Sequence, residues 1–133
     1  MEALAKMIAA DGEGATHLLS CTIKHAADEK SAETLAMSVC SSSLVKAAMF
    51  GADANWGRVL CAMGYADASF DPSKVSVYFA SAVGELLVCE QGRGVAFDED
   101  RAKEILLQAD VEIIADLHQG EAQATCWGCD RNT

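Results

Sequence analysis

The chain has 133 residues, of which 51% are hydrophobic, so it is long enough for one domain with a sizeable apolar core. Its 20 acidic and 10 basic residues give a formal net charge of -10, and a surface of this charge repels nucleic-acid phosphates and anionic lipids. No segment approaches the roughly 18 to 20 apolar residues of a membrane span, and Met1 to Lys6 lack the layout of a secretion signal. We therefore expect a cytoplasmic protein that binds neither nucleic acid nor a membrane.

The spacing of apolar residues predicts the elements of the first half of the chain. Residues 1–10 have helical spacing and stop at Gly12, as the end of a preceding helix would. Residues 16–24 alternate between apolar and polar side chains, which predicts a strand with one face in water. Further helical segments come next along the chain: a helix capped by Asp28 and running to Cys40, a short apolar piece at 44–50, and a helix carrying Trp56 that Asp53 or Asn55 can cap.

The second half contains more strands than helices. Residues 75–80 and 86–90 alternate on either side of Gly84, which predicts a hairpin. After a helix capped by Asp98, two alternating segments at 111–117 and 122–127 flank the Gly120 turn.

The order of these elements is strand, helix, helix, strand, strand, helix, strand, strand, which mixes hairpins with crossovers. It favours an α+β fold, a two-layer sandwich in which helices cover one face of a mixed sheet. No linker or repeat divides the chain, so we expect residues 1–133 to form a single domain.

The cysteines have two interpretations. Cys21, Cys40 and Cys61 lie in apolar-periodic segments and are expected to be buried thiols rather than disulfides. Cys126 and Cys129 have the spacing of a redox dithiol or of half a zinc site. A redox motif normally opens a helix, whereas this one ends an extended segment, and a zinc site needs a second Cys/His pair. The histidines (His17, His25 and His118) are scattered, so no metal is expected, and redox chemistry between Cys126 and Cys129 is a minor alternative.

Glu13 is the best single candidate for a binding residue. It stands between two glycines at a helix-to-strand junction, where the backbone can approach a ligand closely and a carboxylate can meet an ammonium group. The alternative is that the segment from Asp11 to Gly14 is a solvated turn. Local sequence favours the turn.

The segment Asn55-Trp56-Gly57-Arg58 also allows two uses. Its guanidinium and indole are suited to clamping a carboxylate or to holding neighbouring elements together. We favour the structural use, because Trp56 shares an apolar stripe with its helix neighbours. An alternative for Arg58 is a pairing with Asp53 that holds the loop.

Three motifs carry a family resemblance: the run from Phe50 to Tyr65, Asp11-Gly12-Glu13-Gly14-Ala15-Thr16, and Ala124-Thr125-Cys126-Trp127-Gly128-Cys129-Asp130. With them the chain resembles the bifunctional ornithine acetyltransferase / N-acetylglutamate synthase family of arginine biosynthesis, over about Ala5 to Asp130. The resemblance implies the C-terminal domain of that fold, in the C-terminal part of the β chain that the family makes by cleaving itself. It also implies partners: the α chain and the remainder of the β chain, in an α2β2 assembly.

The resemblance further implies an activity, the transfer of acetyl from N2-acetylornithine to glutamate by a ping-pong mechanism. The family's nucleophile is a threonine at the start of the β chain, which is absent here, so the chain alone is expected to be inactive and to contribute no catalytic residue. Thr16 and Thr125 lie within other motifs and are not that nucleophile. Glu13 matches the family's glutamate that contacts the amino-acid substrate. No cofactor is implied, although acetyl-CoA is the acetyl donor in bifunctional members.

Four features depart from the family pattern. His17 replaces a usual lysine, Ser43 a usual proline and Cys126 a usual alanine, and the chain ends at Thr133 without the family's substrate-binding tail. The alternative function is therefore a stand-alone, non-catalytic binding or relic module with the same α+β fold.

Overall fold

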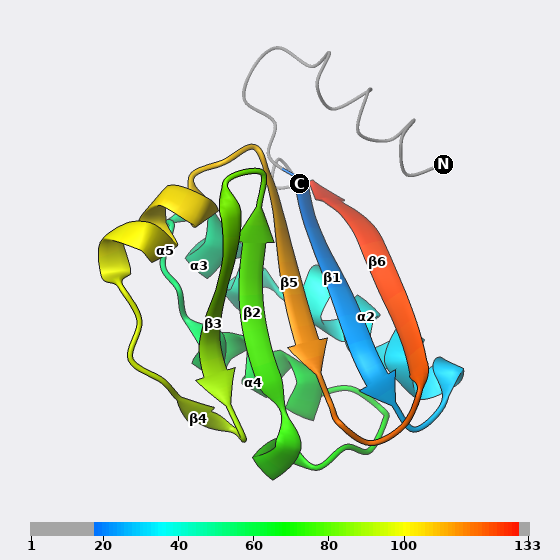
Figure 1. Cartoon of the computed structure of the whole chain (residues 1–133). Helices are drawn as coiled ribbons and strands as arrows, with labels where there is room; N and C mark the ends of the chain where they lie inside the picture. The colour runs from blue at the N-terminus through cyan, green and yellow to red at the C-terminus, as the bar shows by residue number, and fades with distance from the viewer. Residues whose placement is uncertain (1–17, 131–133) are drawn as a thin grey trace.

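A computed structural model describes residues 18–130 and shows a six-stranded mixed sheet with helices behind it (Figure 1). The strands are β1 (Leu18–Ala26), β2 (Ser76–Ser81), β3 (Gly84–Glu90), β4 (Arg93–Gly94), β5 (Asp110–Asp116) and β6 (Ala122–Asp130). The helices are α2 (Glu29–Ser41), α3 (Ser43–Phe50), α4 (Trp56–Gly64) and α5 (Glu99–Leu106), with a 3-10 turn at Pro72–Lys74. The α+β class is confirmed.

The strand order is β4-β3-β2-β5-β1-β6, so the first described strand lies between the last two. β1 and β5 run parallel, and every other neighbouring pair is antiparallel. The sheet therefore combines the predicted hairpin of β2 and β3 with a long crossover from β1 to β5. β6 forms one edge of the sheet.

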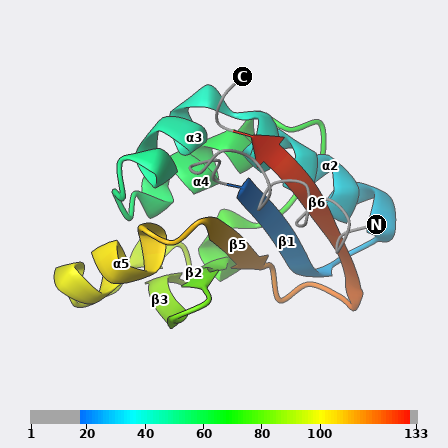
Figure 2. The same cartoon turned by 90° about the horizontal axis from the view of Figure 1, so that it is seen from above.

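The core lies between the sheet and the helices. Seen from above, α2, α3 and α4 lie on the same side of the sheet (Figure 2). Leu19, Ile23 and Phe79 from the strands and Leu35 and Met63 from the helices are fully buried. Burying an apolar side chain of this size contributes roughly 1.5–3 kcal/mol, so this single interface provides most of the driving force for folding.

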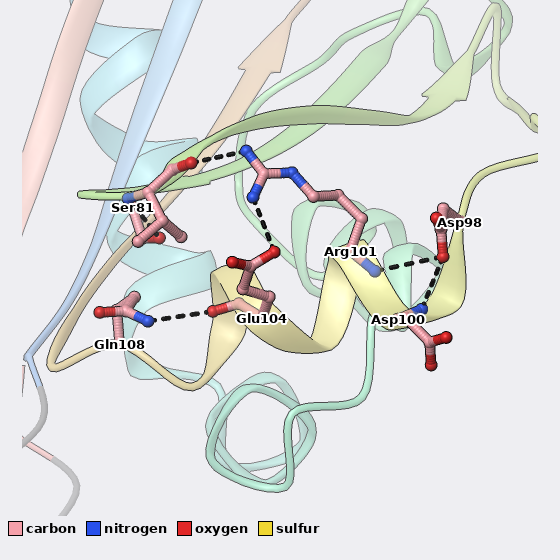
Figure 3. Close-up of polar contacts among 7 residues, drawn as sticks. Ser81, Asp98, Asp100, Arg101, Glu104 and Gln108 are labelled. Atoms are coloured by element: carbon pink, nitrogen blue, oxygen red, sulfur yellow. Dashed lines mark hydrogen bonds and ion pairs between the residues drawn. The ribbon is translucent and has the colours of Figure 1, made fainter.

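α5 is fastened to the β2–β3 hairpin by one side chain. Asp98 begins the helix as predicted, because its Oδ1 accepts hydrogen bonds from the backbone N–H groups of Asp100 and Arg101 at 2.9 and 3.3 Å. The guanidinium of Arg101 donates to the carbonyl of Val83 at 2.5 Å and to Glu104 at 2.8 Å (Figure 3). The helix thus holds the turn of the hairpin.

The segment at 43–50 is a complete helix, so three helices rather than two come after β1. Ser42 explains the difference, because it ends α2 and begins α3: its backbone N–H donates to the Val39 carbonyl, and its Oγ accepts from the Val45 N–H at 3.2 Å. Of the two expected caps for α4, the structure uses Asn55. The 3-10 turn and β4 are further elements that the apolar pattern did not predict.

Two burial predictions need correction. The face of β1 expected to be in water is nearly closed, with Ser20 and Thr22 only 9% and 5% exposed, because strands flank β1 on both sides. Cys21 and Cys40 are buried as predicted, whereas Cys61 is exposed on α4. The helix predicted at 1–10 lies outside the described residues. No helix between residues 18 and 130 is long and apolar enough to cross a membrane.

Candidate functional site

Glu13, the predicted substrate-binding residue, lies outside the residues that the structure describes, and its role stays a prediction. The described residues begin with β1 at Leu18. They include the other candidates: Arg58, Trp56, Cys126 and the histidines at 25 and 118.

Arg58 and Trp56 hold helices and strands together. The Nη1 atom of Arg58 donates to the carbonyl of Leu44 at 3.2 Å, which ties α4 to α3. No ion pair between Arg58 and Asp53 occurs within residues 18–130, so the predicted pairing is wrong. The indole of Trp56 packs on β4, where a Cβ added to Gly94 would lie 2.5 Å from the ring. These contacts favour the structural use of both residues.

The helices leave one face of the sheet open (Figure 1). Hydrogen bonds join a row of three polar side chains from neighbouring strands: Glu112, Thr22 and Thr125. The hydroxyl of Thr22 in β1 donates to Oε2 of Glu112 in β5 at 2.6 Å, and it lies 2.9 Å from the hydroxyl of Thr125 in β6. Because Thr22 has one hydroxyl proton, which goes to the carboxylate, Thr125 is the donor in the second bond. A threonine beside a carboxylate has the composition of a nucleophile and its base. Here the Thr22 hydroxyl is nearly enclosed, so the row serves to join three strands.

A second polar cluster lies where β1 and β5 end. Asp116, whose side chain is 16% exposed, accepts at Oδ1 from the backbone N–H of His118 at 3.1 Å and lies 2.9 Å from Nδ1 of His25. The Nδ1 atom of His118 is 2.7 Å from the carbonyl oxygen of Lys74, and because a carbonyl only accepts, this nitrogen carries a proton. The Nε2 atom of the same ring lies 3.5 Å from Oδ2 of Asp116.

Although these histidines are scattered along the sequence, the structure stacks the rings of His25 and His118 with their centroids 6.5 Å apart. The contact depends on the parallel pairing of β1 with β5, which brings the ends of both strands to the same edge of the sheet. The sequence alone does not reveal that pairing. The cluster fastens two loops and the 3-10 turn to one another.

Two hollows open near this end of the sheet. The larger, of about 530 Å³, has Asp28 and Asp71 among its lining residues. Both carboxylates serve their own turns, since Asp28 accepts from the Ser31 N–H at 2.8 Å and Asp71 accepts from the N–H and hydroxyl of Ser73 at 3.0 and 2.7 Å. The bonds from Ser73 hold the pKa of Asp71 below its usual value. The smaller hollow, of about 240 Å³, is lined in part by Ser76 and His118.

The Cys126-x-x-Cys129 motif lies in β6 and does not open a helix. Across the sheet, Cys126 pairs with Cys21 and Cys129 pairs with Leu19. Among the described residues, no group of three or more His, Cys, Asp or Glu side chains is arranged to hold a metal ion. The structure therefore places this motif in a strand and not at the start of a helix.

These features define an α+β domain whose mixed sheet has helices on one face and interlocking polar side chains on the other. The chain belongs to the ArgJ family, whose model matches residues 1–132. The predicted family is thereby confirmed.

Curated relatives support the same assignment. The chain is 49% identical over 129 residues to the arginine biosynthesis bifunctional protein ArgJ of Thermotoga neapolitana, covering 97% of this chain and 32% of that protein. It is 52% identical over 127 residues to the protein of the same name from Symbiobacterium thermophilum, covering 96% and 31%. It is 45% identical over 127 residues to the glutamate N-acetyltransferase of Methanopyrus kandleri, covering 96% and 33%. The chain thus spans about a third of the length of the curated relatives it matches.

A solved structure confirms the fold. The crystal structure of the arginine biosynthesis bifunctional protein ArgJ from Bacillus halodurans matches with a TM-score of 0.82 at 38% identity, covering 96% of this chain and 59% of that chain. The placement of this chain at the C-terminal end of the longer protein stays a prediction.

Proposed function

We propose that this chain is part of a cytoplasmic N-acetyltransferase that moves acetyl from N2-acetylornithine to glutamate in arginine biosynthesis. The observation that carries the proposal is the 45% identity, over 127 residues, to a protein named glutamate N-acetyltransferase. The likeness in fold to the ArgJ protein of Bacillus halodurans supports it.

In the proposed ping-pong mechanism, a threonine on another segment of the enzyme takes the acetyl group and passes it to glutamate. A threonine at a chain start needs no separate base, because its own α-amine removes the hydroxyl proton. Thr22 and Thr125 lie inside strands and have no α-amine to act as base. This supports a nucleophile supplied from outside the described part of the chain.

Glu13 has the proposed role of receiving the ammonium group of ornithine or glutamate. In the full-length protein, Glu13→Ala should raise the apparent KM for both amino acids, because an ammonium ion loses its charged acceptor. Glu121→Ala, at an exposed position beside β6, is a matched control that should leave both KM values unchanged. Unchanged kinetics of the Glu13 variant would remove that residue from the site.

The proposed partners are the α chain and the rest of the β chain, assembled as α2β2. Acetyl transfer should appear when the full-length gene is expressed and purified, with parallel lines in double-reciprocal plots and two chains on a denaturing gel. If the full-length protein lacks acetyl transfer under these conditions, the alternative of a non-catalytic module holds. Labelled acetyl-CoA tests the second donor, because a bifunctional enzyme would transfer its label to glutamate.

A further inference from the structure

Three thiols gather where α2 crosses β1 and β6: Cys21 on β1, Cys126 on β6 and Cys40 on α2. Cys21 is fully buried in the core, and Cys126 is partly buried and packs against the same core. The Sγ atom of Cys126 lies 3.9 Å from the sulfur of Met37 on α2, which shows that this thiol points toward the helix layer. Cys21 and Cys126 therefore share one face of the sheet.

Cys21 and Cys126 are also direct partners across the antiparallel pair of β1 and β6. Directly opposed residues in such a pair have Cα atoms about 4.5–5.5 Å apart, and disulfides span Cα distances of about 4.4–6.8 Å. A register shift lies immediately beside the pair, between Leu19 and Cys21. Strand pairs bend and twist more strongly at such irregularities.

Cys40 is the rival partner for Cys126, and its thiol faces backbone carbonyl oxygens of β1 and β6. Its Sγ atom lies 3.4 Å from the carbonyl oxygen of Cys126 and 3.7 Å from that of Leu19, so its thiol donates to the backbone of both strands. We propose that Cys21 and Cys126 form a reversible cross-strand disulfide when the protein meets a low-molecular-weight disulfide. This inference rests on strand register and stands apart from the proposed acetyl transfer.

The reaction takes place in two exchange steps. The more accessible thiol, Cys126, loses its proton to solvent and attacks one sulfur of the small disulfide, which releases one small thiol and leaves a mixed disulfide on Cys126. Cys21 then loses its proton and attacks the Cys126 sulfur, which releases the second small thiol. The protein is oxidised by two electrons, and the small disulfide is reduced to two thiols. Because Cys21 is buried, the second step requires β6 to open at its edge and is the slower one.

The product would fasten the edge strand covalently to the middle of the sheet. Among the described strands, β6 pairs with β1 alone, so its other edge carries no ladder. A bond between β1 and β6 would suppress fraying of this edge. Oxidation should therefore slow hydrogen exchange along β6 and raise the midpoint of thermal unfolding by several degrees.

The test uses the full-length protein, purified reduced and then incubated with oxidised glutathione. After remaining thiols are alkylated, digestion with trypsin cuts after Lys6, Lys24, Lys103 and Arg131, giving peptides 7–24 with Cys21 and 104–131 with Cys126 and Cys129. Mass spectrometry should find these two peptides linked, and reduction should separate them. Their link should persist in Cys129→Ser and be lost in Cys126→Ser.

Three outcomes would overturn the proposal. The first is a mixed disulfide in which glutathione stays on Cys126 and no bond to Cys21 forms. The second is a disulfide between peptide 104–131 and peptide 31–46, which contains Cys40. The third is a disulfide between peptides 7–24 and 104–131 that still forms in Cys126→Ser. Circular dichroism of Cys126→Ser shows whether the variant is folded. The Cys129→Ser variant keeps both Cys21 and Cys126. If Cys126→Ser does not fold, the absence of a link between peptides 7–24 and 104–131 in Cys129→Ser would still refute the proposal.

Discussion

The Nδ1 atom of His25 lies 2.9 Å from Oδ1 of Asp116, and this contact joins the ends of two parallel strands. Asp116→Ala should lower the free energy of unfolding by about 1–2 kcal/mol, because the N–H of His118 and the His25 ring lose their acceptor. The loss stays modest because both imidazole rings are about half exposed and water replaces part of the contact. Urea unfolding measures it, with Asp110→Ala, exposed at the start of the same strand, as the control. Equal midpoints for the two variants would contradict the role of Asp116.

Thr22→Val should destabilise the protein by about 1–3 kcal/mol. The substitution keeps the shape of the side chain but removes the donor to Glu112 and the acceptor of Thr125. Ser76→Ala is the control, because Ser76 is equally buried and its hydroxyl makes no hydrogen bond to any residue in 18–130. Thermal unfolding compares the stability of the two variants. A larger loss of stability for Ser76→Ala than for Thr22→Val would contradict a stabilising role of the hydrogen bonds of Thr22.

Gly120→Ala should destabilise the protein by about 1–3 kcal/mol, since a Cβ there would collide with the carbonyl oxygen of Ala26 and lie 3.1 Å from the Cα of Ala27. Both obstacles belong to the backbone and cannot rotate away. At Gly64, in the last turn of α4, an added Cβ meets nothing within 4 Å. Gly64→Ala should therefore leave stability unchanged or raise it by up to about 1 kcal/mol. Chemical denaturation that ranks these two variants in the reverse order would refute the packing explanation.

Cys89 should make the protein less stable in alkali. Burial raises the pKa of this thiol above its ordinary value of 9.0, because the core disfavours the thiolate. A group whose folded pKa is raised contributes stability below its unfolded pKa and loses it as pH rises, so the loss begins near pH 9. Melting temperatures between pH 7 and 10 should fall less steeply for Cys89→Ala than for the parent. Equal slopes for the two proteins would contradict this role of Cys89.

The sequence predicted features that depend on near neighbours. Asp28 and Asp98 begin α2 and α5 because a capping carboxylate bonds N–H groups two or three residues away. Alternation likewise predicted the β2–β3 hairpin, whose strands are close along the chain. These interactions are complete within a short segment, so a single sequence reveals them.

Features that depend on register were not predicted. His25 and His118 meet only because β1 pairs in parallel with β5, and Arg58 reaches Leu44 only because α4 packs on α3. The water-facing side of β1 was also mistaken, because alternation shows which residues share a face but not how well neighbouring strands cover it. For the candidate site, the contacts of Arg58 and Trp56 favour a structural use, and the role of Glu13 stays a prediction.

The strand order has a consequence for the folding of this domain during translation. β1 needs β5 on one side and β6 on the other, and both are made near the end of the described segment. Until then, the apolar side chains of Leu19, Cys21 and Ile23 have no flanking strands, although α2, α3 and α4 have already emerged. Such a nascent chain exposes a strand that other chains can capture. The sheet therefore cannot close around β1 until β5 and β6 have both been made.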